Sequence, residues 1–418
     1  MSNDKVAIIG GGAAGLFASC RLIQSGIVPT LFEPNQLLGM KLGITGKGRC
    51  NVTNNCSVSE FMESIVSNPK FMYSSLNRFT PADTMAFFEQ LGVPLKTERG
   101  RRVFPVSDKA TDIVLAMKNF IVSNGCKIVN ERVTSLSATD NKITTIKTNK
   151  KSYSGFEYII LCTGGLSYPK TGSTGDGYKL ASSLGHTVTD LSPSLIPLEC
   201  YEESCREMMG LSLKNTGVKI IDNNSGKIVY NDFGEVLFTH FGLSGPTILS
   251  ASTHMYPMEP KKYSVSLDLK PALDYETLDK RVLSDFSKYS NKVITNALSD
   301  LLPSKMIVPF VDFCKISRDK KVNSITSLER ESIVSGLKNY VFAVKGFRPI
   351  SEAMVTRGGV RVNEINPNTL KSKKCDNLFF AGEIIDVDAY TGGFSLQIAF
   401  STANAAAMAI NDEITNKN

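Results

Sequence analysis

The chain has 418 residues, of which 42% are hydrophobic, and this size predicts a globular protein of two or three domains. The polar start and the lack of 18 consecutive apolar residues argue against export and membrane insertion, so we expect a cytoplasmic protein. Nine scattered cysteines with only three histidines argue against a metal site or disulfide framework, and the diffuse net charge of +7 favours an anionic small molecule over nucleic acid.

The first element is an apolar strand that leads through a glycine-rich turn into a helix, KVAIIGGGAAGLFASCRLIQSG. Gly10, Gly12 and Gly15 have the G-x-G-x-x-G spacing, which allows a tight turn, close approach of the backbone to pyrophosphate, and close helix packing. A second strand ends in Glu33, 18 residues after Gly15, where an acid accepts ribose hydroxyls. These features predict a dinucleotide site, but alone they do not separate FAD from NAD.

The stretch GITGKGRCNVTN, residues 43–54, combines glycines, basic residues and small polar side chains without apolar periodicity, so we expect a loop. Alternating strands follow, and the apolar strand YIILC ends at Thr163, Gly164 and Gly165. A strand that ends in glycines beside a nucleotide-binding sheet is typical of a cofactor edge.

Near the C-terminus, residues 377–410 repeat this pattern with a strand, Gly382-Glu383, a loop, Gly392-Gly393 and a helix of small residues. The N–H groups at the start of this helix favour negative charge, which a reduced flavin carries at N1 and the C2 carbonyl. Together with the N-terminal motif, this segment predicts a two-part FAD site.

Six stretches carry a resemblance to a known family: IIGGGAAGL, KLGITGKGRCNVTN, LCTGGLSYPKTGSTGDGY, GEVLFTHFGLSGPTIL, VTRGGVRVNEI and LFFAGEIIDVDAYTGGFSLQIAFS. The chain resembles the two-dinucleotide-domain-type flavoproteins, most closely the bacterial HI0933-like or BaiN-like NAD(P)/FAD-dependent oxidoreductases. It departs from their usual pattern at Ser395, where Asn is usual, and at Thr402, where Gly is usual.

The resemblance implies that residues 43–54 wrap the pyrophosphate and the flavin edge, where Lys41 or Arg49 offsets phosphate charge and Asn51 and Thr53 bond the flavin rim. The full set of expected FAD-binding residues is Gly10, Gly12, Ala13, Ala14, Gly15, Glu33, Lys41, Thr45, Gly46, Arg49, Asn51, Val133, Thr163, Gly164, Gly382, Glu383, Gly393, Phe394 and Leu396.

The expected fold is α/β, with a discontinuous Rossmann-like FAD-binding domain made of residues 1–192 and 346–418, because both halves of the cofactor site must share one sheet. For the insertion we expect a β-rich, barrel-like subdomain over 193–270, which contains an Asn-Asn-Ser-Gly hairpin turn. A helical subdomain is expected over 271–345. Its last helix covers TSLERESIVSGLKNYVF and opens with a capping box from Thr326 to Glu329.

FAD would supply hydride chemistry, and the protein would provide a proton from Tyr390, Tyr168, Arg357 or His240. The resemblance favours an enzyme that uses NADH or NADPH, docked transiently, to reduce a conjugated double bond in a steroid-like, bile-acid-like or other enone. Two alternatives remain: an oxidase of small amines that forms hydrogen peroxide, and a flavin-containing binding or RNA-associated protein without turnover. The sequence does not indicate an oligomeric state.

Overall fold

The computed structural model describes residues 5–417, and the chain divides into two compact units. The first unit combines the chain up to Ser194 with the chain from Ile350, and the second unit is Leu195–Pro349. Each unit has its own cluster of buried apolar side chains. The polar start of the chain, residues 1–4, lies outside the described residues.

The first unit is built on a five-stranded parallel sheet in the order β19-β10-β1-β2-β6. The strands are β1 (Val6–Ile9), β2 (Thr30–Phe32), β6 (Lys127–Val129), β10 (Tyr158–Leu161) and β19 (Leu378–Phe380). In chain order this is the doubly wound arrangement 3-2-1-4-5, in which ligands bind at the carboxyl ends of the strands where the strand order reverses. The expected Rossmann-like fold is confirmed, and its strand order predicts a ligand site where β1 and β10 end.

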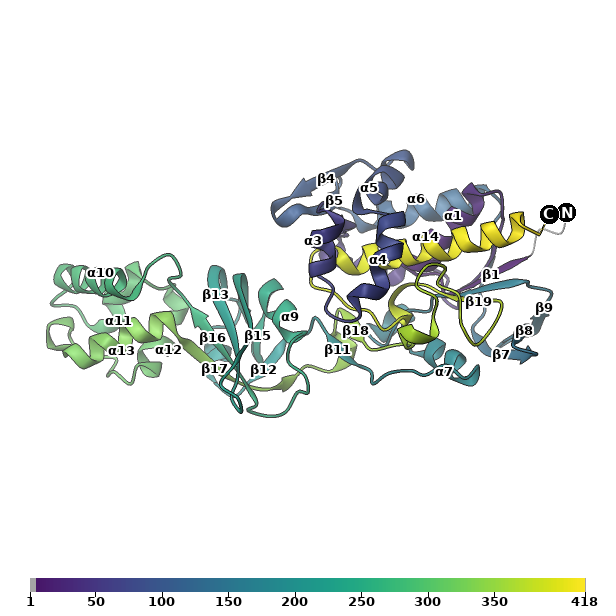
Figure 1. The fold of residues 1–418 in the computed structure, drawn as a ribbon. Helices are drawn as coiled ribbons and strands as arrows, with labels where there is room; N and C mark the ends of the chain where they lie inside the picture. The colour runs from purple at the N-terminus through teal and green to yellow at the C-terminus, as the bar shows by residue number, and fades with distance from the viewer. Residues whose placement is uncertain (1–4, 418) are drawn as a thin grey trace. The chain divides into compact units, whose positions relative to one another are not determined.

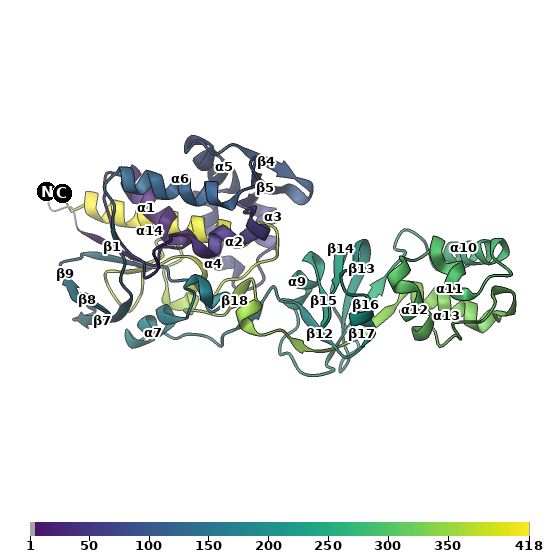
Figure 2. The same cartoon turned by 180° about the vertical axis from the view of Figure 1, so that it is seen from behind.

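Two layers cover this sheet, as Figures 1 and 2 show from opposite sides. One face carries α1 (Ala13–Gln24), α6 (Ala110–Ser123) and α14 (Phe394–Thr415), with α14 lying along α1. The other face carries the meander β7 (Val133–Thr139), β8 (Lys142–Thr148) and β9 (Ser152–Ser154), followed later by α7 (Asp176–Ser183). The Tyr153 ring packs edge-on against Phe32 at 5.1 Å between centroids, which holds the meander to the sheet.

The first unit also has several shorter helices and two small sheets. It contains α2 (Met40–Gly48), α3 (Val58–Glu63), α4 (Pro69–Arg78), α5 (Pro81–Gln90), a small sheet of β3 (Thr53–Asn54), β5 (Arg102–Pro105) and β4 (Leu95–Glu98), and the antiparallel pair β11 (Ser192–Ser194) and β18 (Val355–Arg357). Among the described residues, no helix is both long and apolar enough to cross a membrane.

The glycine-rich stretch at 43–54 differs from the expected loop at both of its ends. It begins inside α2 and ends in β3, and only its middle is irregular. Thr45 is extended, while Gly46 and Lys47 are left-handed with φ of 56° and 59°. The helix therefore stops because two successive residues take a conformation that breaks its hydrogen-bond ladder, and glycine adopts this conformation without strain.

The second unit is a closed six-stranded barrel with helices appended, which confirms the barrel-like insertion. Its strands, in barrel order, are β12 (Leu198–Cys200), β15 (Gly242–Ser244), β14 (Ile228–Phe238), β13 (Ser212–Asp222), β16 (Tyr263–Asp268) and β17 (Tyr340–Phe347). Its helices are α8 (Ser204–Glu207), α9 (Pro246–Ser252), α10 (Tyr275–Lys288), α11 (Ile294–Ala297), α12 (Ser304–Phe313) and α13 (Ser327–Lys338). The Asn223–Gly226 turn joins β13 to β14, and the capping box of Thr326 and Glu329 is present.

The expected end of the last helix is wrong. Asn339 ends α13, and Tyr340 begins β17, which pairs with both β12 and β16 to close the barrel. Tyr340, Phe342 and Val344 are buried while the residues between them are half-buried. This period of two belongs to a strand, and it overrides the helical pattern that precedes it. Residues 340–345 therefore belong to the barrel and not to a helical subdomain.

Candidate cofactor site

The turn between β1 and α1 contains glycines with two different roles. A Cβ on Gly15 would lie 1.8 Å from the Gly10 carbonyl oxygen, and a Cβ on Gly10 would lie 2.5 Å from the Cys162 carbonyl oxygen. Gly12 is different, because no atom of the described chain lies within 4 Å of a Cβ built on it. Gly10 and Gly15 are thus required by packing, whereas Gly12 leaves open space at the start of α1.

That open space adjoins unpaired backbone donors. Gly12 is the N-cap of α1, and the first N–H groups of a helix, here from Ala13 and Ala14, have no intrahelical acceptor. Helix N-termini attract phosphate through these groups and through the helix dipole. The geometry matches the expected place of a pyrophosphate.

Glu33 lies next to this turn and is 8% exposed. Its Oε2 accepts the Gly11 N–H at 2.7 Å, and its Oε1 accepts both the N–H and the side-chain amide of Asn35, at 3.0 and 2.7 Å. These three donors fix the orientation of the carboxylate before any ligand is present. A fixed carboxylate at the end of the second strand suits a pair of ribose hydroxyls.

Glu33 lines a pocket together with residues at the ends of the neighbouring strands. It is lined by Ile9, Gly10, Phe32, Glu33, Pro34, Glu131, Arg132, Val133, Thr163, Gly172, Thr174, Asp176 and Leu180. Arg132 and Asp176 form an ion pair at this pocket. Four of the sequence-predicted residues, Gly10, Glu33, Val133 and Thr163, thus line one cavity, while Gly164 follows it with a φ of 73°.

Two buried polar atoms test whether these residues fit a dinucleotide. In the described part of the chain, Thr163 Oγ1 and Asn51 Oδ1 have no hydrogen-bond partner. A buried polar atom without a partner costs about 1–3 kcal/mol, so such atoms are typical of a site that a polar ligand completes. Thr163 lies at the pocket and Asn51 in the glycine-rich stretch, at two different parts of the predicted site. The residues present fit FAD.

The C-terminal part of the predicted site packs directly on the N-terminal part. A Cβ on Gly382 would lie 2.8 Å from the Ala14 Cβ, and a Cβ on Gly393 would lie 2.4 Å from the Thr53 carbonyl. Phe394 is 8% exposed and packs edge-on against Phe61 at 4.9 Å. The start of α14 is therefore fixed against the glycine-rich stretch, and Leu396 packs partly buried against the same core.

This packing corrects one expected role in the glycine-rich stretch and gives a second residue partners within the chain. Thr53 is fully buried and its hydroxyl donates to Gln397 Oε1 at 2.6 Å, so it does not face a flavin rim. Arg49 donates to Glu98 and Asp108 at 2.5 Å each and stacks over the Phe104 ring at 4.1 Å. The hydrogen bonds that Arg49 donates to Glu98 and then Asp108 raise its pKa, and a direct contact of Arg49 with phosphate stays a prediction.

Lys41 and Glu383 were both expected at the cofactor, and the structure pairs them with each other at 2.6 Å. Glu383 also accepts hydrogen bonds from the Ser167 hydroxyl at 3.0 Å and the Thr356 N–H at 2.9 Å. Both ion-paired side chains are 20% exposed. This network links α2, the loop after β10, β18 and the segment after β19, all of which border the predicted site. A direct contact of either residue with FAD stays a prediction.

The remaining predicted residues of the stretch are held locally. The Thr45 hydroxyl donates to the Leu42 carbonyl at 2.7 Å, and the Thr45 carbonyl accepts the Cys50 N–H at 3.0 Å. Gly46 is left-handed and a Cβ there would meet the Asn51 nitrogen at 3.2 Å. The stretch is thus folded back on itself around Cys50, which is fully buried.

The departure at Thr402 has a structural explanation. Its hydroxyl oxygen accepts the Gly382 N–H at 2.9 Å and its hydroxyl lies 2.6 Å from the Ile398 carbonyl of the same helix. The extra side chain therefore fastens the Gly382 turn to α14 where a glycine would only allow close packing. Nothing in the structure explains Ser395.

Three of the four candidate proton donors lie in the first unit. The Tyr390 N–H donates to the Ser64 carbonyl at 3.0 Å, and the Tyr168 N–H donates to the Ser351 carbonyl at 3.3 Å. Arg357 ends β18 and contributes to the electrostatic environment of Asp386. His240 lies in the second unit, exposed in the turn between β14 and β15, with its ring 4.9 Å from that of Phe241.

Sequence reasoning missed several residues that shape this site. Asp388 is 3% exposed, its Oδ2 accepts the Ser194 hydroxyl at 2.6 Å, and its Oδ1 has no partner among the described residues. Asn54 donates from one amide nitrogen to the carbonyls of both Gly100 and Gly392, each at 3.1 Å. The acid-rich run DVD before the glycine pair was a signal for Asp388, but no local pattern indicates the partners of Asn54.

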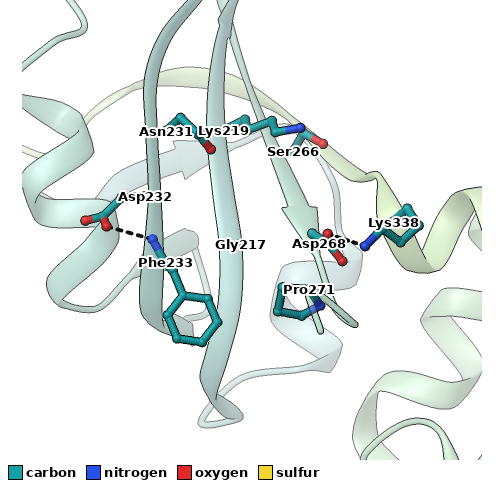
Figure 3. A pocket seen from close by; sticks show the side chains of 9 residues that line it. All are labelled: Gly217, Lys219, Asn231, Asp232, Phe233, Ser266, Asp268, Pro271 and Lys338. Carbon is teal, nitrogen blue, oxygen red and sulfur yellow. Dashed lines mark hydrogen bonds and ion pairs between the residues drawn. The ribbon is translucent and has the colours of Figure 1, made fainter. Parts of the chain in front are cut away.

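The second unit has a cavity of its own, of about 380 Å³, on the outer face of the barrel (Figure 3). One of its two lysines, Lys338, is paired with Asp268 at 2.6 Å and also donates to the carbonyls of Lys270 and Leu273. Asp232 accepts the Phe233 N–H at 2.7 Å. Lys338, Asp268 and Asp232 thus have partners within the second unit, whereas Lys219 has none among the described residues.

Comparison with known proteins gives a family and two similar curated relatives. A family model described as HI0933-like protein Rossmann domain matches residues 4–409. The chain is 28% identical to a 3-dehydro-bile acid delta(4,6)-reductase of Clostridium scindens, over 97% of this chain and 98% of that protein. It is 30% identical to a ribosomal RNA dihydrouridine synthase of Haemophilus influenzae, over 96% of this chain and 97% of that protein.

Among solved structures, the fold is similar to the open conformation of a flavocytochrome c3 fumarate reductase, with a TM-score of 0.52 and 16% identity. The match covers 98% of this chain and 78% of that one. At this identity the likeness concerns the fold, and it agrees with the parallel sheet and inserted unit described above.

Proposed function

The chain belongs to the HI0933-like family of Rossmann-fold flavoproteins, and we propose that it reduces a carbon–carbon double bond conjugated to a carbonyl, with FAD as its cofactor. The supporting observation is the two-part cradle of the first unit, where the open space at Gly12 and the unpartnered Thr163 Oγ1 and Asn51 Oδ1 fit a dinucleotide.

The names of the two relatives support this reaction class. A 3-dehydro-bile acid delta(4,6)-reductase and a dihydrouridine synthase act on unlike molecules. Both names nevertheless describe saturation of a double bond that is conjugated to a carbonyl, in a steroid ring in one case and in a uracil ring in the other. We therefore propose the enone or enone-like group, and not the rest of the molecule, as the common substrate feature.

When bound, FAD supplies the hydride that such a reduction needs at the carbon β to the carbonyl. The chain must then bind the substrate, exclude water and deliver a proton to the α carbon. We propose Tyr390 for the proton, because it is partly buried, its backbone is fixed by Ser64, and it lies just before the Gly392-Gly393 pair. Tyr168, Arg357 and His240 are the alternative donors.

We propose NADH or NADPH as the hydride source for the flavin, docking transiently. Only one G-x-G-x-x-G after a strand is present in the sequence, so a second dinucleotide domain is not indicated. Donor and acceptor would then use the flavin in turn, which predicts ping-pong kinetics.

The test is anaerobic double-mixing stopped flow. NADH or NADPH should bleach the flavin absorbance, and a 3-keto steroid with a conjugated double bond, or a uridine-containing RNA, should restore it with formation of the saturated product. Restoration by oxygen alone, with peroxide formed from small amines and no reduction by either nicotinamide, would favour the amine oxidase. No redox turnover with any of these would leave a flavin-containing binding protein.

The proton donor is tested by Tyr390→Phe, which keeps the ring and removes the hydroxyl. Reoxidation by the conjugated acceptor should slow by about 100-fold or more, while reduction by nicotinamide changes little. Tyr168→Phe is the matched control in the same unit. An unchanged reoxidation rate in Tyr390→Phe, with slowing in Tyr168→Phe, would transfer the role to Tyr168.

A further inference from the structure

A cluster of basic residues borders the C-terminal part of the cofactor site. The segment 95–109, LKTERGRRVFPVSDK, contains five Lys or Arg and two Asp or Glu, and it forms the hairpin of β4 and β5. The hairpin lies beside α3 and α5 in both views (Figures 1 and 2). Its tip carries Arg99, Arg101 and Arg102, and we call these three residues together with Lys47 the basic rim.

Lys47 belongs to the rim because its loop packs along the same hairpin. The Val52 N–H donates to the Val103 carbonyl at 2.8 Å, and a Cβ on Gly46 would lie 3.5 Å from the Phe104 ring. Lys47 itself is exposed at the tip of this loop, with a φ of 59°. The rim is therefore formed by two adjacent segments of the first unit.

The rim is fixed to the start of α14 through Asn54. The side-chain amide of Asn54 donates to the Gly100 carbonyl at the hairpin tip and to the Gly392 carbonyl, each at 3.1 Å. Gly392 immediately precedes the N-cap of α14, where the flavin end of the site is predicted. The basic residues thus stand next to the place where a substrate would meet the flavin.

Among the described residues, the acids near the rim leave two of its four cations without a partner. Glu98 and Asp108 pair with Arg49 and Lys96, and Glu60 pairs with Arg101 at 2.6 Å. In the described part of the chain Arg99 and Lys47 have no ion pair and no side-chain hydrogen bond, and both are exposed. Unpaired like charges held on neighbouring segments repel each other, so their gathering beside a site indicates a role in binding anions.

We propose that the basic rim binds the phosphates of single-stranded RNA, so that a uracil base can reach the flavin end of the site. This inference rests on the proposed function, since uracil has the conjugated carbonyl that the reaction requires. A single carboxylate, as on a bile acid, would need one cation, whereas the two exposed cations Arg99 and Lys47 on neighbouring segments suit two phosphodiesters of one strand. The expectation of a chain without nucleic-acid partner came from the diffuse net charge and the lack of a continuous Lys/Arg run, and neither criterion detects a cluster made of two separate segments.

The test uses the FAD-loaded full chain and a fluorescently labelled single-stranded RNA of about 20 nucleotides that contains uridines. Anisotropy is measured over a series of salt concentrations for the wild type, for Arg99→Gln/Lys47→Gln, and for the control Lys127→Gln/Lys142→Gln. The control removes two exposed strand lysines that also lack described partners, so the change in charge is the same. Flavin absorbance and melting temperature check that all three proteins are folded and loaded.

The rim variant should bind RNA more weakly. The slope of log affinity against log salt concentration should be smaller in magnitude by about 1.4, because each of the two lost phosphate contacts on a single strand contributes roughly 0.7. The control should match the wild type. Equal binding by the two variants, or no RNA binding by the wild type, would overturn the inference. A raised KM for NADPH with unchanged RNA binding would also overturn it, by assigning the rim to the nicotinamide nucleotide.

The two proposals fail in different ways. If RNA binding depends on the rim but no conjugated acceptor reoxidises the flavin, the proposed reaction is wrong and the proposed role of the rim stands. If a steroid enone reoxidises the flavin but the protein does not bind RNA, the proposed role of the rim is wrong and the proposed reaction stands.

Discussion

The two ends of the cofactor site are built in different ways. The adenosine end depends mainly on one short stretch of sequence, because the Gly10–Gly15 turn, the start of α1 and Glu33 follow each other in the chain, although Gly10 also packs against the distant Cys162. The flavin end is assembled from segments separated by hundreds of residues, such as Asn54 with Gly392 and Lys41 with Glu383. A local motif therefore specifies the first end, whereas the second exists only once the chain has folded.

The largest expected effect separates two glycines within the adenosine end. Gly15→Ala places a Cβ 1.8 Å from the Gly10 carbonyl, so we expect a loss of about 4 kcal/mol or more in the free energy of unfolding, or no folded protein. Gly12→Val meets no atom of the described chain at its Cβ and should give a folded but colourless protein, because its side chain fills the pyrophosphate space.

Circular dichroism and flavin absorbance of the two purified variants check this contrast. A folded, colourless Gly15→Ala protein, or full FAD occupancy in Gly12→Val, would contradict the assignment of packing to one glycine and ligand approach to the other.

A smaller effect tests the long-range pairing of the flavin end. Lys41→Met leaves the Glu383 carboxylate at a site where both side chains are only 20% exposed, and should lower the free energy of unfolding by about 2 kcal/mol. The double variant Lys41→Met/Glu383→Gln should recover part of this loss, because it also removes the carboxylate charge that Lys41→Met leaves without a partner. Chemical denaturation of the two single variants and the double variant measures the coupling.

FAD affinity gives the control for this pair. If Lys41 acts through Glu383, each single variant should change the affinity for FAD to a similar extent. A large loss of affinity in Lys41→Met with none in Glu383→Gln would instead place Lys41 on the phosphates.

The smallest expected effect concerns pH. Burial raises the pKa of Asp386 above its usual 3.8, although hydrogen bonds from Thr189 and Asn68 oppose this. A carboxyl with a raised pKa in the folded state stabilises the fold below the pKa of the unfolded chain, and that contribution is lost as pH rises through the folded-state pKa. Asp386→Asn should therefore gain stability relative to the wild type as pH rises above 3.8, the usual pKa of the carboxyl.

Denaturation at several pH values measures this difference. A variant that becomes less stable than the wild type as pH rises would show that Arg357 stabilises the ionised carboxylate more than burial disfavours it.

The same contrast explains what sequence reasoning achieved. The Rossmann-like sheet, the barrel, the hairpin turn at Asn223–Gly226 and the capping box at Thr326 were predictable, because periodicity and turn chemistry are local. The pairing of Arg49 with Glu98 and Asp108 was not predictable, because nothing in GITGKGRC indicates which acids lie beside it. The extension of β17 to Tyr340 was missed for a related reason, since the barrel partners of that strand are distant in the sequence.

The most direct test of the two-ended site is the identity of the flavin released when the purified protein is denatured by heat. The account predicts FAD, released without covalent attachment, because Glu33 and the Gly10–Gly15 turn are shaped for the adenosine diphosphate part that FMN lacks. Release of FMN alone would contradict this prediction. So would a purified protein that contains no flavin and does not bind added FAD.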